Sequence, residues 1–110
     1  MSRRRPGVLT LLAAALLCGA GLAAAPIPEG ASHTVTIENM VYNPARLVVH
    51  RGDRIVWVNK DLFPHTVTAA AFDSGSISVG GSWSYTVQKS GDFAYGCTFH
   101  PTMKGELKAE

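Results

Sequence analysis

Cysteine is scarce in this chain of 110 residues, which contains only Cys18 and Cys97. Cys18 lies in an apolar N-terminal stretch that we expect to be removed, so one cysteine remains in the mature domain. A single cysteine cannot form an internal disulfide bond, which excludes the disulfide-rich class of small exported domains. The remaining thiol is then either a buried structural residue or a group with metal-binding or reactive chemistry.

The chain also lacks an excess of positive charge beyond its first residues. Ten Lys and Arg residues stand against eight Asp and Glu residues, but Arg3, Arg4 and Arg5 are three of the ten. The rest of the chain has seven basic and eight acidic side chains, so the basic pI of 8.7 comes from the N-terminal segment. Without an excess of positive charge in this part of the chain, there is no case for nucleic-acid binding.

The N-terminal segment is typical of a secretory signal peptide. Its three arginines precede residues 8–25, which are almost wholly apolar and end in small residues. We expect residues 1–25 to be the signal peptide, with cleavage near Ala23–Ala25, and residues 26–110 to be one domain in the periplasm. A membrane anchor is the alternative, but about 18 apolar residues rich in Ala and Gly match a spanning helix poorly.

Helical periodicity is missing as well, and strand signals recur instead. Seven segments combine alternating or continuous apolar residues with flanking turn residues: 33–38, 46–50, 55–58, 66–68, 83–87, 93–95 and 104–108. Short strands at this spacing predict an all-β fold, a sandwich or a barrel. In a sandwich the loops gather at two ends, so the loops at 60–64 and 96–103 can meet at one end.

The loop between the last two predicted strands carries the most distinctive side chains. Cys97, His100 and Met103 follow one another at intervals of three residues, and His65 lies upstream. One thiolate, two imidazoles and one thioether are the ligand set of a blue-copper electron-transfer centre. Met103 taken alone would be interpreted as a core residue, but its spacing from the other residues favours a ligand. The sequence therefore predicts a copper site made by these four side chains.

Residues 93–105, Phe-Ala-Tyr-Gly-Cys-Thr-Phe-His-Pro-Thr-Met-Lys-Gly, resemble the copper loop of cupredoxins. The two-residue gap between His100 and Met103 is similar to that of amicyanins and shorter than that of plastocyanins. The resemblance implies a Greek-key β-sandwich of about eight strands with one type 1 copper per chain. It also implies that His65, Cys97 and His100 are the equatorial ligands and that Met103 is the weak axial ligand. Further similarity lies in the segments 39–45, 52–53, 57–59 and 64–67.

Two residues depart from the pattern of amicyanins and plastocyanins. Thr66 follows the first histidine where Asn is usual, and Phe99 stands where Pro is usual. Neither position supplies a ligand, so we expect these residues to affect loop rigidity and reduction potential. We predict that the Thr66 N–H donates to the Cys97 sulfur and that the Thr66 hydroxyl bonds to the loop near Thr98, because such contacts orient metal ligands.

These features predict a periplasmic carrier of single electrons between redox proteins, and not an enzyme. The amicyanin-like loop suggests an amine dehydrogenase and a c-type cytochrome as partners, and we expect a monomer. Electrons are expected to pass through His100, within an apolar surface that includes Phe63 and Phe99. Copper storage, delivery or resistance is the alternative, which the presence of only two Met residues in the mature chain disfavours. A copper-free interaction domain would leave the complete ligand set unexplained.

Overall fold

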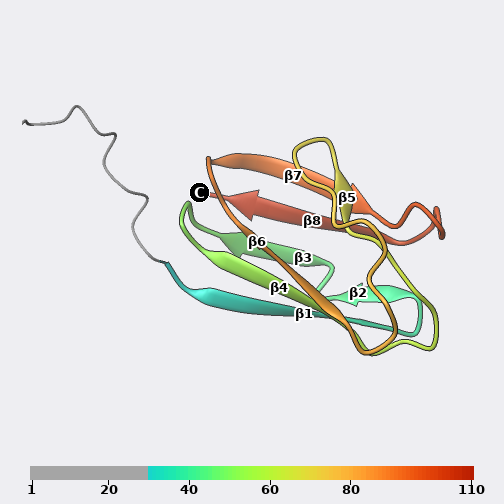
Figure 1. Ribbon diagram of the computed structural model, residues 1–110. Helices are drawn as coiled ribbons and strands as arrows, with labels where there is room; N and C mark the ends of the chain where they lie inside the picture. The colour runs from blue at the N-terminus through green and yellow to red at the C-terminus, as the bar shows by residue number, and fades with distance from the viewer. Residues whose placement is uncertain (1–29) are drawn as a thin grey trace, which may run out of the picture.

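The computed structural model describes residues 30–110, which form eight β-strands in two sheets (Figure 1). The strands are β1 (Ser32–Glu38), β2 (Val41–Asn43), β3 (Arg46–Val49), β4 (Arg54–Asn59), β5 (Thr68–Ala69), β6 (Ser82–Thr86), β7 (Gly91–Gly96) and β8 (Lys104–Ala109). The expected all-β sandwich of about eight strands is confirmed. The expected signal peptide, residues 1–25, lies outside the described residues. Residues 30–110 contain no helix that is long and apolar enough to cross a membrane.

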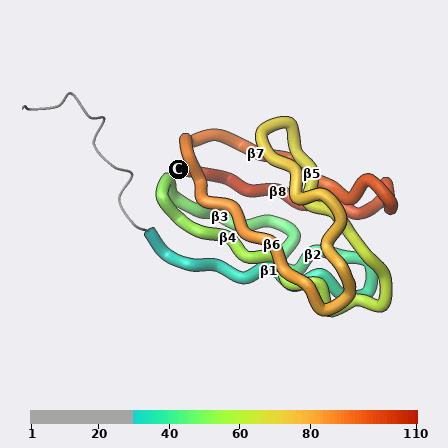
Figure 2. Tube along the Cα trace, viewed as in Figure 1, coloured from blue at the N-terminus to red at the C-terminus, as the bar shows by residue number. Residues whose placement is uncertain are grey.

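Each sheet has four strands and one parallel pair. The first sheet has the order β2-β1-β4-β6, and the second has the order β3-β8-β7-β5. β1 lies parallel to β4, β3 lies parallel to β8, and the other neighbours are antiparallel. The chain passes from the first sheet into β3 of the second sheet before it returns to β4, which is the crossing expected of a Greek-key sandwich (Figure 2).

The core fills the space between the sheets because alternate residues of the central strands point inward. Trp57 of β4 is fully buried, and its ring packs against Trp83 at 5.6 Å and against Tyr95 at 5.5 Å between ring centroids. Tyr95 belongs to β7 of the opposite sheet, so this aromatic contact joins the two sheets. The tight fit extends to Gly105 of β8, where a Cβ atom would overlap the Tyr95 ring.

The strands differ from the expected segments in two places. β2 was not expected, because it has only three residues and follows a turn in which Asn39 and Met40 have φ angles of 55° and 62°. The expected strand at 66–68 is shorter and begins only at Thr68. The reason is that the Val67 N–H donates to the hydroxyl of Ser74, at 2.7 Å, rather than to a neighbouring strand.

Asp53 fixes the end of the sandwich at which β1 begins. Its carboxylate accepts hydrogen bonds from the backbone N–H groups of Ala31 and His50, each at 2.9 Å, and contacts His33 Nε2 at 2.8 Å. These bonds tie the start of β1 to the turn between β3 and β4. The loops that carry the predicted ligands lie at the other end, with the turn between β1 and β2 (Figure 1).

Candidate metal centre

The loop between β7 and β8 places Cys97 and Met103 at its base and His100 at its tip. Three backbone hydrogen bonds close this loop: Cys97 N–H to the Met103 carbonyl at 3.3 Å, His100 N–H to the Cys97 carbonyl at 3.4 Å, and Met103 N–H to the His100 carbonyl at 2.9 Å. Cys97 and Met103 are buried, whereas His100 is half-buried. The sulfur atoms therefore point to the interior while the imidazole of His100 reaches the surface.

His65 comes from the loop that follows β4, and the Asn59 side chain shapes this loop. The Asn59 amide donates to the carbonyls of Phe63 and Ile77, at 2.8 and 3.0 Å, and its side-chain oxygen accepts from the Asp61 N–H at 3.0 Å. His65 and Ile77 also exchange two backbone hydrogen bonds, at 3.2 and 2.7 Å. His65 is fully buried as a result, and its backbone is held on both sides.

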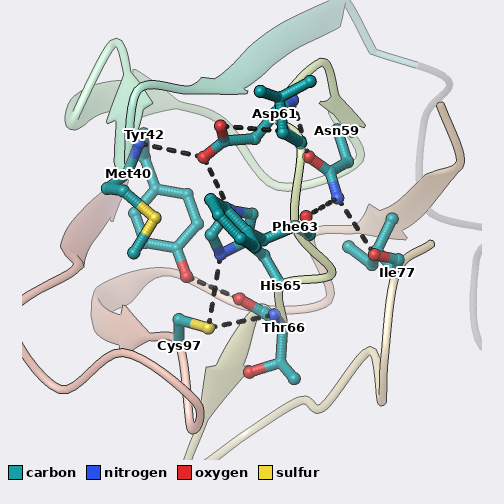
Figure 3. Close-up of polar contacts among 10 residues, drawn as sticks. Met40, Tyr42, Asn59, Asp61, Phe63, His65, Thr66, Ile77 and Cys97 are labelled. Carbon is teal, nitrogen blue, oxygen red and sulfur yellow. Dashed lines mark hydrogen bonds and ion pairs between the residues drawn. The ribbon is translucent and has the colours of Figure 1, made fainter. Parts of the chain in front are cut away.

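The imidazole of His65 faces the sulfur of Cys97 across the site (Figure 3). The distance from His65 Nδ1 to Cys97 Sγ is 3.7 Å. Nitrogen and sulfur ligands bind an ion of the size of copper or zinc at about 2.0–2.3 Å. At tetrahedral or trigonal angles, two such ligand atoms therefore lie roughly 3.3–3.8 Å apart. The pair therefore fits a single copper ion.

Thr66 makes both contacts that the sequence predicted for it. Its N–H donates to Cys97 Sγ at 3.3 Å, and its hydroxyl oxygen accepts from the Thr98 N–H at 2.9 Å. Burial of the Cys97 thiol disfavours its ionisation, but the hydrogen bonds that the sulfur accepts, led by the one from the Thr66 N–H, outweigh this effect and hold the pKa of Cys97 below its ordinary value. A lowered pKa favours the thiolate, which is the form that binds metals.

Asp61 is a site residue that the sequence analysis missed. Its Oδ2 atom lies 2.8 Å from His65 Nε2 and accepts from the Met40 N–H at 3.0 Å, while Oδ1 accepts from the Leu62 N–H at 2.9 Å. These bonds, led by the one from Met40, keep the pKa of Asp61 below its ordinary value although burial opposes this. A carboxylate four residues before a predicted ligand, in the same loop, was the available signal.

The predicted ligands thus lie together at one end of the sandwich. The His65 and His100 rings are 4.9 Å apart between centroids, and Phe63 packs against His100 at 6.5 Å. Within residues 30–110, no three His, Cys, Asp or Glu side chains form a closed metal cluster. The His65–Cys97 pair is accordingly the preformed part of the site, and His100 and Met103 flank it on the loop.

Comparison with known proteins agrees with this geometry. Residues 8–109 match the family model of the cupredoxin-like domain. The amicyanin of Paracoccus denitrificans is 34% identical over 95 residues, which are 80% of this chain and 72% of that protein. The amicyanin of Paracoccus versutus is 30% identical over 96 residues, 81% of this chain and 72% of that protein.

Solved structures give the same result. The reduced state of an amicyanin variant is 30% identical and superposes with a TM-score of 0.68, covering 72% of this chain and 82% of that one. A purple cupredoxin from Nitrosopumilus maritimus, at 22% identity and a TM-score of 0.68, shares the fold. With its copper-type donor set at one end of an eight-stranded sandwich, this chain belongs to the cupredoxins, the blue copper proteins that carry electrons, and is related to amicyanins.

Proposed function

We propose that this protein carries single electrons between redox proteins in the periplasm, using one type 1 copper bound by His65, Cys97, His100 and Met103. The observation that carries the proposal is the buried pair of His65 Nδ1 and Cys97 Sγ, 3.7 Å apart, with a backbone N–H aimed at the sulfur. When bound there, copper would supply a one-electron Cu(I)/Cu(II) couple.

The surrounding residues limit how much the site can move when copper would change between Cu(I) and Cu(II). His65 is held through its backbone and through Asp61, and Cys97 is held at the end of β7 by the loop hydrogen bonds and by Thr66. Met103 is buried at the base of the same loop. A site fixed by two sheets has little freedom to rearrange, which is what rapid electron exchange requires.

The surface around His100 supports a transient contact with a partner. Leu62, Phe63 and Phe99 are exposed by 82%, 54% and 51%, although their side chains are large and apolar. Exposed apolar side chains gathered at one place mark interaction sites, and His100 lies beside Phe63. An amine dehydrogenase and a c-type cytochrome are the partners we propose.

An absorption spectrum of the copper-loaded protein without residues 1–25 tests this function. An intense thiolate-to-copper band in the visible range is expected, and Cys97→Ala should abolish it. Met103→Leu should keep the colour and shift the reduction potential, since an axial thioether is a weak ligand that tunes the potential. A colourless protein that exchanges Cu(I) rapidly would refute electron transfer and favour copper storage or delivery.

A further inference from the structure

We propose that Asp61 is a positioning residue for the copper ligand His65: its carboxylate fixes which ring nitrogen carries the proton and lowers the reduction potential of the site. This inference rests on the function proposed above. It starts from the 2.8 Å contact between His65 Nε2 and Asp61 Oδ2.

The position of the carboxylate decides the proton on His65. A carboxylate accepts hydrogen bonds and does not donate them, and Asp61 is held in this form by two backbone donors, the N–H groups of Met40 and Leu62. Nε2 must therefore carry the hydrogen when the His65 ring is neutral. The lone pair of the ring is then on Nδ1, the atom that faces Cys97 Sγ. Asp61 thus selects the form of His65 that can bind the metal.

The geometry makes Asp61 part of the site and not an incidental neighbour. The Asp61 side chain is only 9% exposed, and the His65 side chain is fully buried, so little water screens their interaction. In Figure 3 the His65 ring lies between the Asp61 carboxylate on one side and the Cys97 sulfur on the other. Asp61 thus contacts one ring nitrogen of His65 while the other faces Cys97, which is the arrangement that a carboxylate–histidine–metal site would require.

Asp61 also links His65 to the turn between β1 and β2. The oxygen that contacts His65 is the same one that accepts from the Met40 N–H. Met40 has a φ angle of 62°, which a residue with a side chain adopts only when its surroundings hold it there. The Asp61 carboxylate therefore cannot swing away from His65 without releasing this turn.

The charge of Asp61 predicts the direction of the redox effect. A buried negative group beside a ligand stabilises the ion of higher charge, so it favours Cu(II) over Cu(I) and lowers the reduction potential. Changing a carboxylate of this kind costs about 10- to 100-fold in metal affinity. If Asp61→Asn weakens Cu(II) tenfold and leaves Cu(I) unchanged, the potential rises by about 59 mV, the value for a tenfold change in a one-electron couple.

The first measurement uses the wild-type protein without copper. Nitrogen-15 NMR at mildly alkaline pH distinguishes the two neutral forms of a histidine ring, and we expect His65 to carry its proton on Nε2. A proton on Nδ1 would overturn the proposal. Because no copper is present, this result does not depend on the colour of the loaded protein, so failure of the proposed function and failure of this inference can be told apart.

The second measurement compares Asp61→Asn with Asp92→Asn, which removes the same charge from an exposed residue of β7. Voltammetry should give a higher potential for Asp61→Asn, and copper titration should give a 10- to 100-fold weaker Cu(II) affinity, while Asp92→Asn matches the wild type. Equal potentials for the two variants would refute a positioning role, even if Asp61→Asn were less stable. If Asp61→Asn does not fold, the NMR result on the wild-type protein decides.

Discussion

The hydroxyl of Thr66 joins the two loops that carry the proposed copper ligands, and valine in its place tests what this bridge contributes. Valine keeps the branched shape but leaves the Thr98 N–H without its acceptor at 2.9 Å. A buried donor left unpaired costs about 1–3 kcal/mol. Thr98 is exposed, so water can partly replace the acceptor, and the loss should be near the lower limit, about 1 kcal/mol.

Thermal unfolding of the copper-free protein measures this loss. For a domain of 60–100 residues, 1 kcal/mol corresponds to about 4–8 °C in Tm, so Thr66→Val should unfold at a temperature lower by about this amount. Thr86→Val is the matched control, because Thr86 lies exposed on β6. Thr66→Asn should keep most of the stability, since its amide oxygen can accept from the Thr98 N–H.

The colour of the copper-loaded variant gives the second half of this test. The hydrogen bond to Cys97 Sγ comes from the backbone of Thr66, which valine also has. The visible band should therefore persist in Thr66→Val. Identical Tm values for Thr66→Val, Thr86→Val and the wild type would show that the bridge contributes nothing. Loss of the visible band would show that the Thr66 hydroxyl, and not its backbone N–H, is needed to hold the Cys97 sulfur in place.

Two further changes test the other end of the sandwich and the partner surface. Hydrogen bonds from His33 and from the His50 backbone keep the pKa of Asp53 below its ordinary value of 3.8, so this residue stabilises the fold above that pH and the contribution is lost as the pH falls. In Asp53→Asn, the free energy of unfolding should fall less steeply than in the wild type as the pH is lowered. Parallel profiles of unfolding free energy against pH for the two proteins would contradict this. Phe99→Glu should slow electron self-exchange between two copies of the protein about tenfold through charge repulsion and leave the absorption spectrum unchanged. Val48→Glu, on β3, should leave the self-exchange rate unchanged. Equal self-exchange rates for the two variants would refute the role of the apolar surface.

The sandwich and the ligand loop were predictable because both depend on short-range patterns. Alternation of apolar residues marks a strand whose one face is buried, and most of the expected strands lie within a residue or two of the observed ones. Cys97, His100 and Met103 lie within seven residues, so their proximity follows from the chain itself. His65 was predictable from its position in a loop, since the ends of a sandwich gather loops that are distant in sequence.

The short elements were less predictable because other contacts override the pattern. β2 has three residues, too few for an alternation to be recognised, and its position depends on the turn at Asn39 and Met40. The segment 66–68 alternates correctly, yet Ser74 takes the Val67 N–H and delays the start of β5. In each case a contact with a residue outside the alternating pattern determines the backbone conformation and the point at which the strand begins.

Asp61 shows where spacing stops being informative. Its interval of four residues before His65 does not show whether the carboxylate contacts the ring, because that contact depends on the direction in which the loop turns after β4. That direction is set by the buried amide of Asn59, which binds the loop at Asp61 and Phe63 and the neighbouring segment at Ile77. Candidate ligands can thus be proposed from residue type and interval, whereas the groups that orient them depend on the folded loop.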